Sequence, residues 1–162
     1  MKIVVLSDTH IPKRAKSFPE LLIADLKTAD LIIHAGDWQH PVVYDFLSAF
    51  GKVEGVHGNV DNEEIKNLFP AKKMIQAGHF KIGIIHGYGT GKTTEKRAIK
   101  AFKGDQVDCI IFGHSHIPVL KVVEGILLFN PGSPTDKRRQ PQYSYGIMEA
   151  GEELFARHVF FD

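Results

Sequence analysis

Runs of apolar, often β-branched residues alternate with longer segments of mixed polarity over the first two thirds of the chain. Short apolar runs bounded by Gly, Asp or Asn are typical of buried strands, and the segments between them are typical of helices. The predicted strands in this region are 2–7, 30–34, 52–57, 74–77 and 80–85. The predicted helices are 19–27, 42–50, 62–68 and 93–102.

The last third of the chain is mostly strand. Glu124-Gly125 and Gly151-Glu152 are typical of tight turns between paired strands. An alternating β/α region followed by hairpins indicates a mixed α/β protein in which two sheets pack together with helices outside. No repeat and no linker interrupts the chain, so we expect a single domain over 1–162. The strands predicted here are 107–112, 118–123, 126–129, 143–149 and 153–160.

Several residues predict where helices begin and end. Pro41 suits the first turn of the second helix, and Asp61, with Glu64 three positions later, suits an N-cap of the third. Thr93 or Thr94 opens the fourth helix, and Gly104 follows its end.

Composition and charge narrow the class of protein. The 162 residues carry 20 basic and 19 acidic side chains, so the net charge of +1 gives no general attraction to duplex nucleic acid or acidic membranes. The local basic clusters 13–16 and 137–139 read as solvated loops, with a substrate-attracting rim as the alternative. A single cysteine, Cys109, fits a reducing compartment, and no apolar run approaches the roughly 20 residues of a membrane span. We therefore expect a cytoplasmic protein.

Short polar motifs follow five of the predicted strands. Ligands of α/β sheets bind at the carboxyl ends of the strands, so these motifs predict one site. Their oxygen and nitrogen atoms suit Mn, Fe, Co, Ni or Zn. The motifs are Asp8-Thr9-His10, Gly36-Asp37, Gly58-Asn59, His86-Gly87 and Gly113-His114-Ser115-His116.

The spacing within these motifs suits metal binding. Asp8 and His10 lie two positions apart, on one side of an extended chain, as do His114 and His116. The two oxygens of Asp37 could bridge two metals about 3.5–4 Å apart. Two carboxylates facing two divalent ions leave excess positive charge, which attracts phosphate and lowers the pKa of a bound water.

Together these motifs resemble those of the calcineurin-like metallophosphoesterases, most closely the small YfcE-like phosphodiesterase branch. The matching residues run from Asp8 to His116, and Asn130-Pro131-Gly132-Ser133 resembles a further segment of that branch. The resemblance covers nearly the whole chain. It implies a four-layer α/β/β/α sandwich of two mixed sheets flanked by helices, with a two-metal site at one edge.

The resemblance also implies roles for individual residues. The expected catalytic residues are Asp37, Asn59 and His86, and a hydroxide between two ions would attack phosphorus in line. We expect Mn²⁺, with Ni, Fe, Co and Zn as alternatives. The implied metal ligands are Asp8, His10 and His116 for the first ion, Asn59, His86 and His114 for the second, and Asp37 between them.

The chain departs from the family pattern at Val60, where many larger members have a histidine near the leaving group. Valine cannot donate a proton, so we expect a preference for good leaving groups. His57 and His40 are alternative donors or structural histidines. Asp61 caps a helix or supports Asn59, and His34 bonds a ligand or is a buried, satisfied histidine.

Three residues are candidate substrate contacts. Tyr88 could contact substrate through its hydroxyl or serve in packing. Ser133, on a turn that the resemblance places beside the site, could hold a substrate oxyanion. Trp38 could stack on a base or form an aromatic wall. A phosphate-loop reading of 87–93 fails because its spacing is one residue short.

We expect a two-metal phosphodiesterase acting on small, including nucleotide, phosphodiesters. The alternative is a non-catalytic metal-binding scaffold resembling a retromer-type relative, although such relatives tend to lose ligands that this chain keeps. A DNA nuclease is disfavoured by the net charge. The expected partners are a small phosphate ester and a second or further copy of the chain, as a homodimer or homotetramer, with 155–161 in an interface or in the core.

Overall fold

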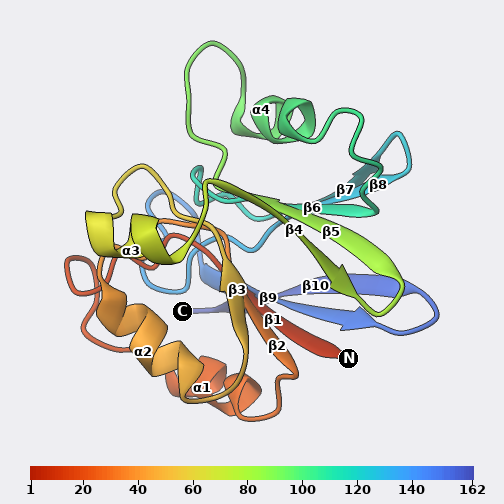
Figure 1. Cartoon of the computed structure of the whole chain (residues 1–162). Helices are drawn as coiled ribbons and strands as arrows, with labels where there is room; N and C mark the ends of the chain where they lie inside the picture. The colour runs from red at the N-terminus through yellow and green to blue at the C-terminus, as the bar shows by residue number, and fades with distance from the viewer.

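The computed structural model describes residues 1–162 as two five-stranded sheets packed face to face, with helices on both outer faces (Figure 1). The four-layer arrangement of two mixed sheets is confirmed. The strands are β1 (Lys2–Leu6), β2 (Leu31–His34), β3 (Val53–Gly55), β4 (Lys72–Ala77), β5 (Phe80–Ile85), β6 (Cys109–Ile111), β7 (Val119–Val123), β8 (Ile126–Asn130), β9 (Tyr143–Ala150) and β10 (Leu154–Phe161). The helices are α1 (Glu20–Leu26), α2 (Pro41–Ser48), α3 (Glu63–Leu68) and α4 (Thr94–Ala101).

Each sheet combines three parallel strands with antiparallel strands toward its edges. The first sheet has the order β10-β9-β1-β2-β3, in which β1, β2 and β3 are parallel. The second has the order β4-β5-β6-β8-β7, in which β5, β6 and β8 are parallel. The parallel strands of one sheet therefore end at a common edge, where their following loops meet.

The central strands are apolar throughout because both of their faces are covered. In β1, Ile3 and Val5 face the second sheet, whereas Val4 and Leu6 pack among residues of α1, α2 and α3. On the outer face of the second sheet, Ala98 and Phe102 of the α4 region pack against Ile110. Figure 1 shows α1, α2 and α3 on one side of the molecule and α4 on the other.

Most of the predicted helix and turn signals are confirmed. Pro41 begins α2, and the Thr93 side chain accepts a hydrogen bond from the Lys96 amide at the start of α4. Glu124 and Gly125 have φ angles of 51° and 80°, as a tight hairpin turn between β7 and β8 requires. None of the four helices has the length and apolar character needed to cross a membrane.

The prediction that Asp61 caps the third helix is wrong. Asn62 is the N-cap of α3, and its side-chain oxygen accepts a hydrogen bond from the Ile65 amide at 3.1 Å. The Asp61 carboxylate instead accepts hydrogen bonds from two loops of the site described below.

Candidate metal centre

The five polar motifs that follow predicted strands converge at one edge of the sandwich. The parallel strands β1, β2 and β3 of one sheet and β5 and β6 of the other direct their following loops to this edge. Two groups of side chains could each hold a metal ion there. Their members are Asp8, His10 and His116 in the first cluster and Asp37, His86 and His114 in the second.

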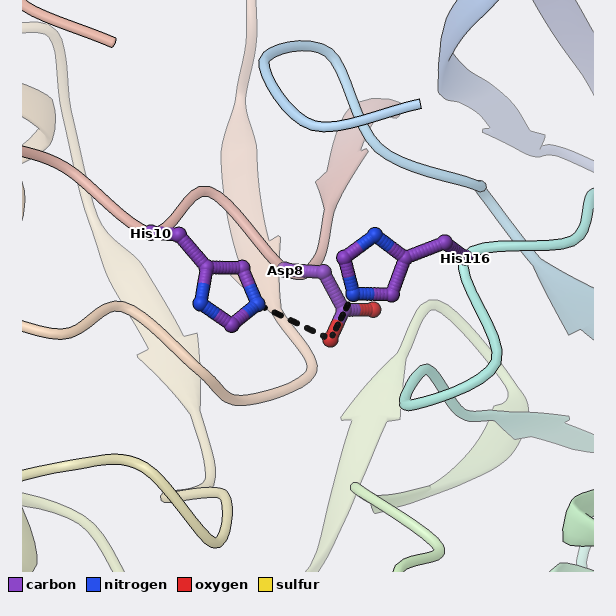
Figure 2. A group of neighbouring side chains, drawn as sticks. All are labelled: Asp8, His10 and His116. Atoms are coloured by element: carbon purple, nitrogen blue, oxygen red, sulfur yellow. Dashed lines mark ion pairs between the residues drawn. The ribbon is translucent and has the colours of Figure 1, made fainter. Parts of the chain in front are cut away.

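The first cluster is buried and closely spaced. His10 Nε2 lies 3.8 Å and His116 Nε2 lies 3.4 Å from Asp8 Oδ1. Figure 2 shows the two imidazole rings on either side of the Asp8 carboxylate, with both contacts reaching the same oxygen. The candidate ligand atoms of this cluster all lie within 4.8 Å of one another, as binding to one ion requires.

Three atoms of the first cluster are buried without a hydrogen-bond partner: Asp8 Oδ1, His10 Nε2 and His116 Nε2. Leaving a buried polar atom unsatisfied costs about 1–3 kcal/mol, so their convergence calls for a shared partner. A divalent cation satisfies one carboxylate oxygen and two imidazole nitrogens together. The residues of this cluster therefore fit a bound metal ion.

Hydrogen bonds on the far side of these groups fix which atoms face the centre. Asp8 Oδ2 accepts from Ser7 Oγ at 2.8 Å and from the His114 amide at 3.0 Å, which leaves Oδ1 free. His116 Nδ1 donates to the Asp136 carbonyl at 2.5 Å, so Nε2 carries the lone pair. Such outer contacts set the tautomer and orientation of metal-binding histidines.

The second cluster has the same construction. His86 Nε2 lies 3.1 Å from Asp37 Oδ2, while His86 Nδ1 donates to the Ala35 carbonyl at 2.8 Å. The amide oxygen of Asn59 lies 3.1 Å from His86 Nε2 and 3.3 Å from His114 Nδ1. The structure thus brings Asn59 to the second cluster, where the sequence predicted it.

Asp37 stands between the two clusters. Its Oδ2 lies 3.6 Å from His10 Nε2 of the first cluster and 3.1 Å from His86 Nε2 of the second. Its Oδ1 accepts a hydrogen bond from the Val60 amide at 3.0 Å, which fixes the carboxylate plane. One oxygen of Asp37 is therefore placed to face both positions.

Five of the seven predicted ligands have a left-handed backbone conformation, for which the sequence gives no signal. A non-glycine residue in this region costs about 1–2 kcal/mol, so the surrounding structure must hold it there. Such strain in consecutive strand-end loops is common where side chains must be aimed at a shared centre. The φ angles are 56° for Asp8, 46° for His10, 60° for Asp37, 67° for His114 and 61° for His116.

Asp61 holds two of these loops together. Its carboxylate accepts hydrogen bonds from the amides of Asp37 at 2.9 Å, Gln39 at 2.7 Å and Gly58 at 2.7 Å. Burial raises the pKa of Asp61, although these amide hydrogen bonds oppose the shift. Asp61 therefore supports the loop that carries Asn59, which is the second of its two predicted roles.

Two glycines allow the loops to approach closely. A Cβ atom on Gly58 would overlap Asp37 Oδ1 and lie 2.6 Å from the Asp37 amide nitrogen. A Cβ atom on Gly36, whose φ is +100°, would lie 2.7 Å from His86 Nδ1. The side chains of Asp37 and His86 thus occupy space that only glycine leaves open.

The ionisable side chains of the two clusters shift one another's pKa values. Burial acts to raise the pKa of Asp8, but the neighbouring His10 side chain and the charges of His86 and His116 outweigh burial and hold this pKa below its usual range. Burial acts to lower the pKa of His86, but Asp37 and Asp8 outweigh it and raise this pKa to about 9. Without a cation, His86 is therefore an imidazolium paired with Asp37 near neutral pH.

Cation binding is expected to release a proton from His86. The pKa of about 9 keeps the ring protonated at neutral pH, and a metal ligand must be neutral, so affinity should rise as pH increases toward 9. Calorimetric titration of chelator-stripped protein with Mn²⁺ at about pH 7.5, in two buffers of different ionisation enthalpy, measures this release. A His79→Gln variant, which changes an exposed histidine, should release the same number of protons. Equal heats in both buffers would contradict the expectation.

His34 is a buried, satisfied histidine rather than a partner of a candidate ligand side chain. Its Nε2 lies 3.1 Å from Thr9 Oγ1, and its Nδ1 accepts from the Gly36 amide at 3.1 Å. Burial lowers its pKa to about 3, so the ring is neutral. Of the two predicted readings, the structural one describes its position.

The structure contradicts base stacking by Trp38. The indole is fully buried, stacked between His34 at 3.9 Å and Phe69 at 4.5 Å between ring centroids. Its Nε1 donates to the Val56 carbonyl at 2.8 Å. Both ring faces are covered, so Trp38 forms an aromatic wall behind the site and has no face for a substrate base.

The structure also contradicts oxyanion binding by Ser133. Its buried hydroxyl donates to the Asp8 carbonyl at 2.8 Å and accepts from the Asp136 amide at 2.8 Å. Ser133 therefore fixes the loop that carries Asp8. The third candidate, Tyr88, is 48% exposed, and its ring centroid lies 6.2 Å from that of His86, so a substrate contact there stays a prediction.

The residues considered as proton donors are placed as follows. Val60 is 44% exposed, and only its backbone amide contacts Asp37. The His40 ring accepts from the Val42 amide at 3.1 Å and is the N-cap of α2. His57 Nδ1 lies 3.3 Å from the Gly58 carbonyl. The structural reading therefore describes His40, whose ring caps a helix.

Comparison with known proteins finds matches over nearly the whole chain. Residues 1–153 match the family model of the calcineurin-like phosphoesterase superfamily domain. A probable metallophosphoesterase of Methanothermobacter thermautotrophicus is 38% identical over 161 residues, which is 98% of this chain and 92% of that protein.

Solved structures share the fold at lower sequence identity. Vps29 from Entamoeba histolytica, complexed with Zn²⁺, has a TM-score of 0.79 and 24% identity, with 100% of both chains covered. A novel archaeal phosphodiesterase has a TM-score of 0.77 and 23% identity, with 99% of this chain and 100% of that chain covered. These two likenesses concern the fold alone.

Proposed function

The chain belongs to the calcineurin-like phosphoesterase superfamily, and on this premise we propose that it is a phosphodiesterase that uses two divalent metal ions. The proposed substrates are small phosphodiesters, including nucleotide esters, and the proposed metal is Mn²⁺, with Ni, Fe, Co and Zn as alternatives. Two clusters of candidate ligands joined by Asp37 suit a pair of ions.

One observation carries the proposal. Asp8 Oδ1, His10 Nε2 and His116 Nε2 are buried, converge, and have no hydrogen-bond partner. A protein that had no use for a cation would leave three polar atoms unsatisfied in one place, at a cost of about 1–3 kcal/mol each. The second cluster brings Asn59, His86 and His114 within contact of one another, with Asp37 between the two clusters.

Two divalent ions held by these residues would make a water-derived nucleophile available at neutral pH and would offset the charge that gathers on the phosphoryl oxygens. The residues of the chain hold and orient the reacting groups. Asp37 would contribute to both positions, and the Ala35 and Asp136 carbonyls orient the rings of His86 and His116. The reaction forms a bond from a water oxygen to phosphorus and breaks the bond from phosphorus to the leaving oxygen.

The environment of the leaving group sets the proposed substrate preference. Val60 stands where many larger relatives carry a histidine, and its side chain has no proton to give. Proton donation to a leaving group contributes about 100- to 10,000-fold to rate, so esters that need it are expected to react slowly. Phenolic leaving groups, which depart as anions, do not need it.

Hydrolysis of chromogenic esters by chelator-stripped protein tests the proposal. Without added metal we expect no release of nitrophenolate; with Mn²⁺ we expect release, faster from bis-p-nitrophenyl phosphate than from p-nitrophenyl phosphate. In a series of substituted phenyl diesters, the rate should fall steadily as the pKa of the leaving phenol rises. Metal-independent release would contradict the two-ion proposal. A rate that does not depend on the leaving group would contradict the inference from Val60.

A second candidate function is a non-catalytic metal-binding scaffold. The fold shared with Vps29, a protein named for vacuolar protein sorting, gives this alternative some support. The chain carries all seven predicted ligands, which favours the enzyme. Stoichiometric binding of two metals without hydrolysis of either chromogenic ester would favour the scaffold.

The proposal also covers the partners and the cellular location of the protein. We propose a homodimer or homotetramer in the cytoplasm that takes a small phosphate ester. Phe155 and Phe160 of β10 are 63% and 50% exposed, whereas Phe161 packs on Tyr143 and Tyr145. The predicted apolar stretch 155–161 therefore has residues available for an interface and residues in the core.

A further inference from the structure

Basic charge is concentrated in one short segment of the chain, 92–103. Of the chain's 20 basic and 19 acidic residues, five basic and one acidic residue lie there, so the remaining 150 residues hold fifteen basic and eighteen acidic ones. This segment contains α4, which covers the outer face of the second sheet (Figure 1). A protein that is nearly neutral overall thus carries a strong local positive charge on one outer layer.

Four lysines of this segment line a groove of about 760 Å³ beside α4. They are Lys92, Lys96, Lys100 and Lys103, and all four are exposed. None of the four forms an ion pair, although the neighbouring Lys72 and Lys121 are paired with Asp105 and Glu95. Glu124 is the one acidic residue of the lining, so the groove presents four unpaired ammonium groups and one carboxylate.

The start of α4 lies against the loop that follows His86 of the candidate metal centre. Gly87 directly follows His86, and Arg97 of α4 donates to the Gly87 carbonyl at 2.8 Å. A Cβ atom on Gly87 would lie 2.9 Å from the Thr94 side chain, so the start of α4 packs against the loop after β5. From this end the lysines continue along α4 to Lys103, beyond the helix.

We propose that this groove binds the phosphate backbone of a single-stranded nucleic acid that extends away from the metal centre. This inference rests on the proposed function, because it names a larger class of phosphodiester for the same site. Lys96 and Lys100 lie one helical turn apart, about 6 Å along the axis, which suits successive phosphates of an extended strand. A positively charged groove that follows the backbone is the usual design for single-strand binding.

The lining of the groove predicts the character of the binding. The only aromatic lining residue, Phe102, is 3% exposed and offers no face on which a base could stack. Binding therefore depends on phosphate contacts, with little base preference and a strong dependence on salt. A strand that continued from the Lys92 end of the groove past the loop after His86 would bring one diester to the centre.

Fluorescence anisotropy with a labelled phosphorothioate thymidylate of about 12 nucleotides tests the groove on metal-loaded protein. Replacing Lys96, Lys100 and Lys103 with glutamine should weaken binding at least 30-fold, a rough estimate for about 50 mM salt, and reduce the slope of log Kd against log salt by about 2. Hydrolysis of bis-p-nitrophenyl phosphate should stay within about twofold of wild type, because this small ester does not extend along the groove.

A matched variant separates the groove from general charge. Lys27, Lys52 and Lys66 are exposed lysines outside the groove; replacing all three with glutamine removes the same charge and should leave binding unchanged. Equal losses in both variants, no loss in either, or displacement of the probe by an equally charged acidic peptide at the same concentration would overturn the proposal. Intact binding without hydrolysis of any ester would contradict the proposed function and leave the groove supported.

Discussion

Replacing Asp37 with alanine is expected to lower kcat/KM for bis-p-nitrophenyl phosphate by about 1000-fold or more. Asp37 Oδ2 lies 3.6 Å from His10 Nε2 and 3.1 Å from His86 Nε2, so its loss removes the group common to both clusters. Several kcal/mol of transition-state stabilisation by metal ions would be lost with it. Steady-state kinetics, together with the metal content of the purified variant, measures the effect; we expect fewer than two ions per chain.

Two further variants give this experiment its controls. Asp45→Ala removes an exposed carboxylate from α2 and should leave both activity and metal content unchanged. Asp37→Asn keeps the shape of the side chain and removes its charge, so it separates charge from packing. Full metal-dependent activity in Asp37→Ala would show that this carboxylate does not join the two positions.

Gly58→Ala is expected to destabilise the protein and to weaken metal binding. The new Cβ atom would overlap Asp37 Oδ1, and a shift of either loop would break the hydrogen bond from the Gly58 amide to Asp61. We expect the free energy of unfolding to fall by about 2–3 kcal/mol and metal affinity to fall with it. Urea unfolding of chelator-stripped protein and metal titration measure the two effects separately.

Gly51→Ala is the matched control for this substitution. A Cβ atom there would meet only the Ala29 carbonyl, at 3.9 Å, which is ordinary contact distance. Its unfolding free energy should lie within about 1 kcal/mol of wild type. A Gly58→Ala protein as stable as Gly51→Ala, with unchanged metal affinity, would contradict the close approach of the two loops.

The strands could be predicted because their environment leaves a clear pattern. β1 and β2 are buried on both faces, so Ile3–Leu6 and Leu31–Ile33 form apolar runs that a helix or loop would not show. The ends of the strands could be predicted less accurately than their positions. The pattern predicts a strand over 107–112, but β6 spans only Cys109–Ile111, although Asp108 and Phe112 still form backbone hydrogen bonds with neighbouring strands.

The meeting of the candidate ligands at one edge could be predicted from the strand topology. The contacts of the residues that support these ligands could not. Motifs at the carboxyl ends of parallel strands must meet, so Asp8, Asp37 and His86 could be grouped from their positions alone. Trp38 and Ser133 were misjudged because their partners lie on other elements, Val56 and Phe69 for the indole and Asp8 for the hydroxyl. A residue that lies near a site residue in sequence can therefore support the site from behind instead of lining it.

The groove beside α4 could not be predicted from the net charge of the chain. Two other basic clusters, 13–16 and 137–139, stand out because their residues are adjacent in sequence. Lys96, Lys100 and Lys103 are not adjacent in sequence, and the turn of α4 brings Lys96 and Lys100 to one side. A net charge of +1 averages this segment against an acidic remainder and gives no indication of it.

Each cluster takes ligands from both halves of the sandwich. Asp8 and His10 follow a strand of the first sheet and His116 a strand of the second; Asp37 and His86 divide in the same way. An ion bound in either cluster would therefore link the two sheets. It could bind only when both sheets are folded against each other. At a free concentration 100 times its Kd, such a ligand adds about 2.7 kcal/mol to the free energy of unfolding. We therefore expect the thermal tolerance of this protein to follow the metal supply of its surroundings, and metal removal to loosen the sandwich at the edge where chemistry is proposed.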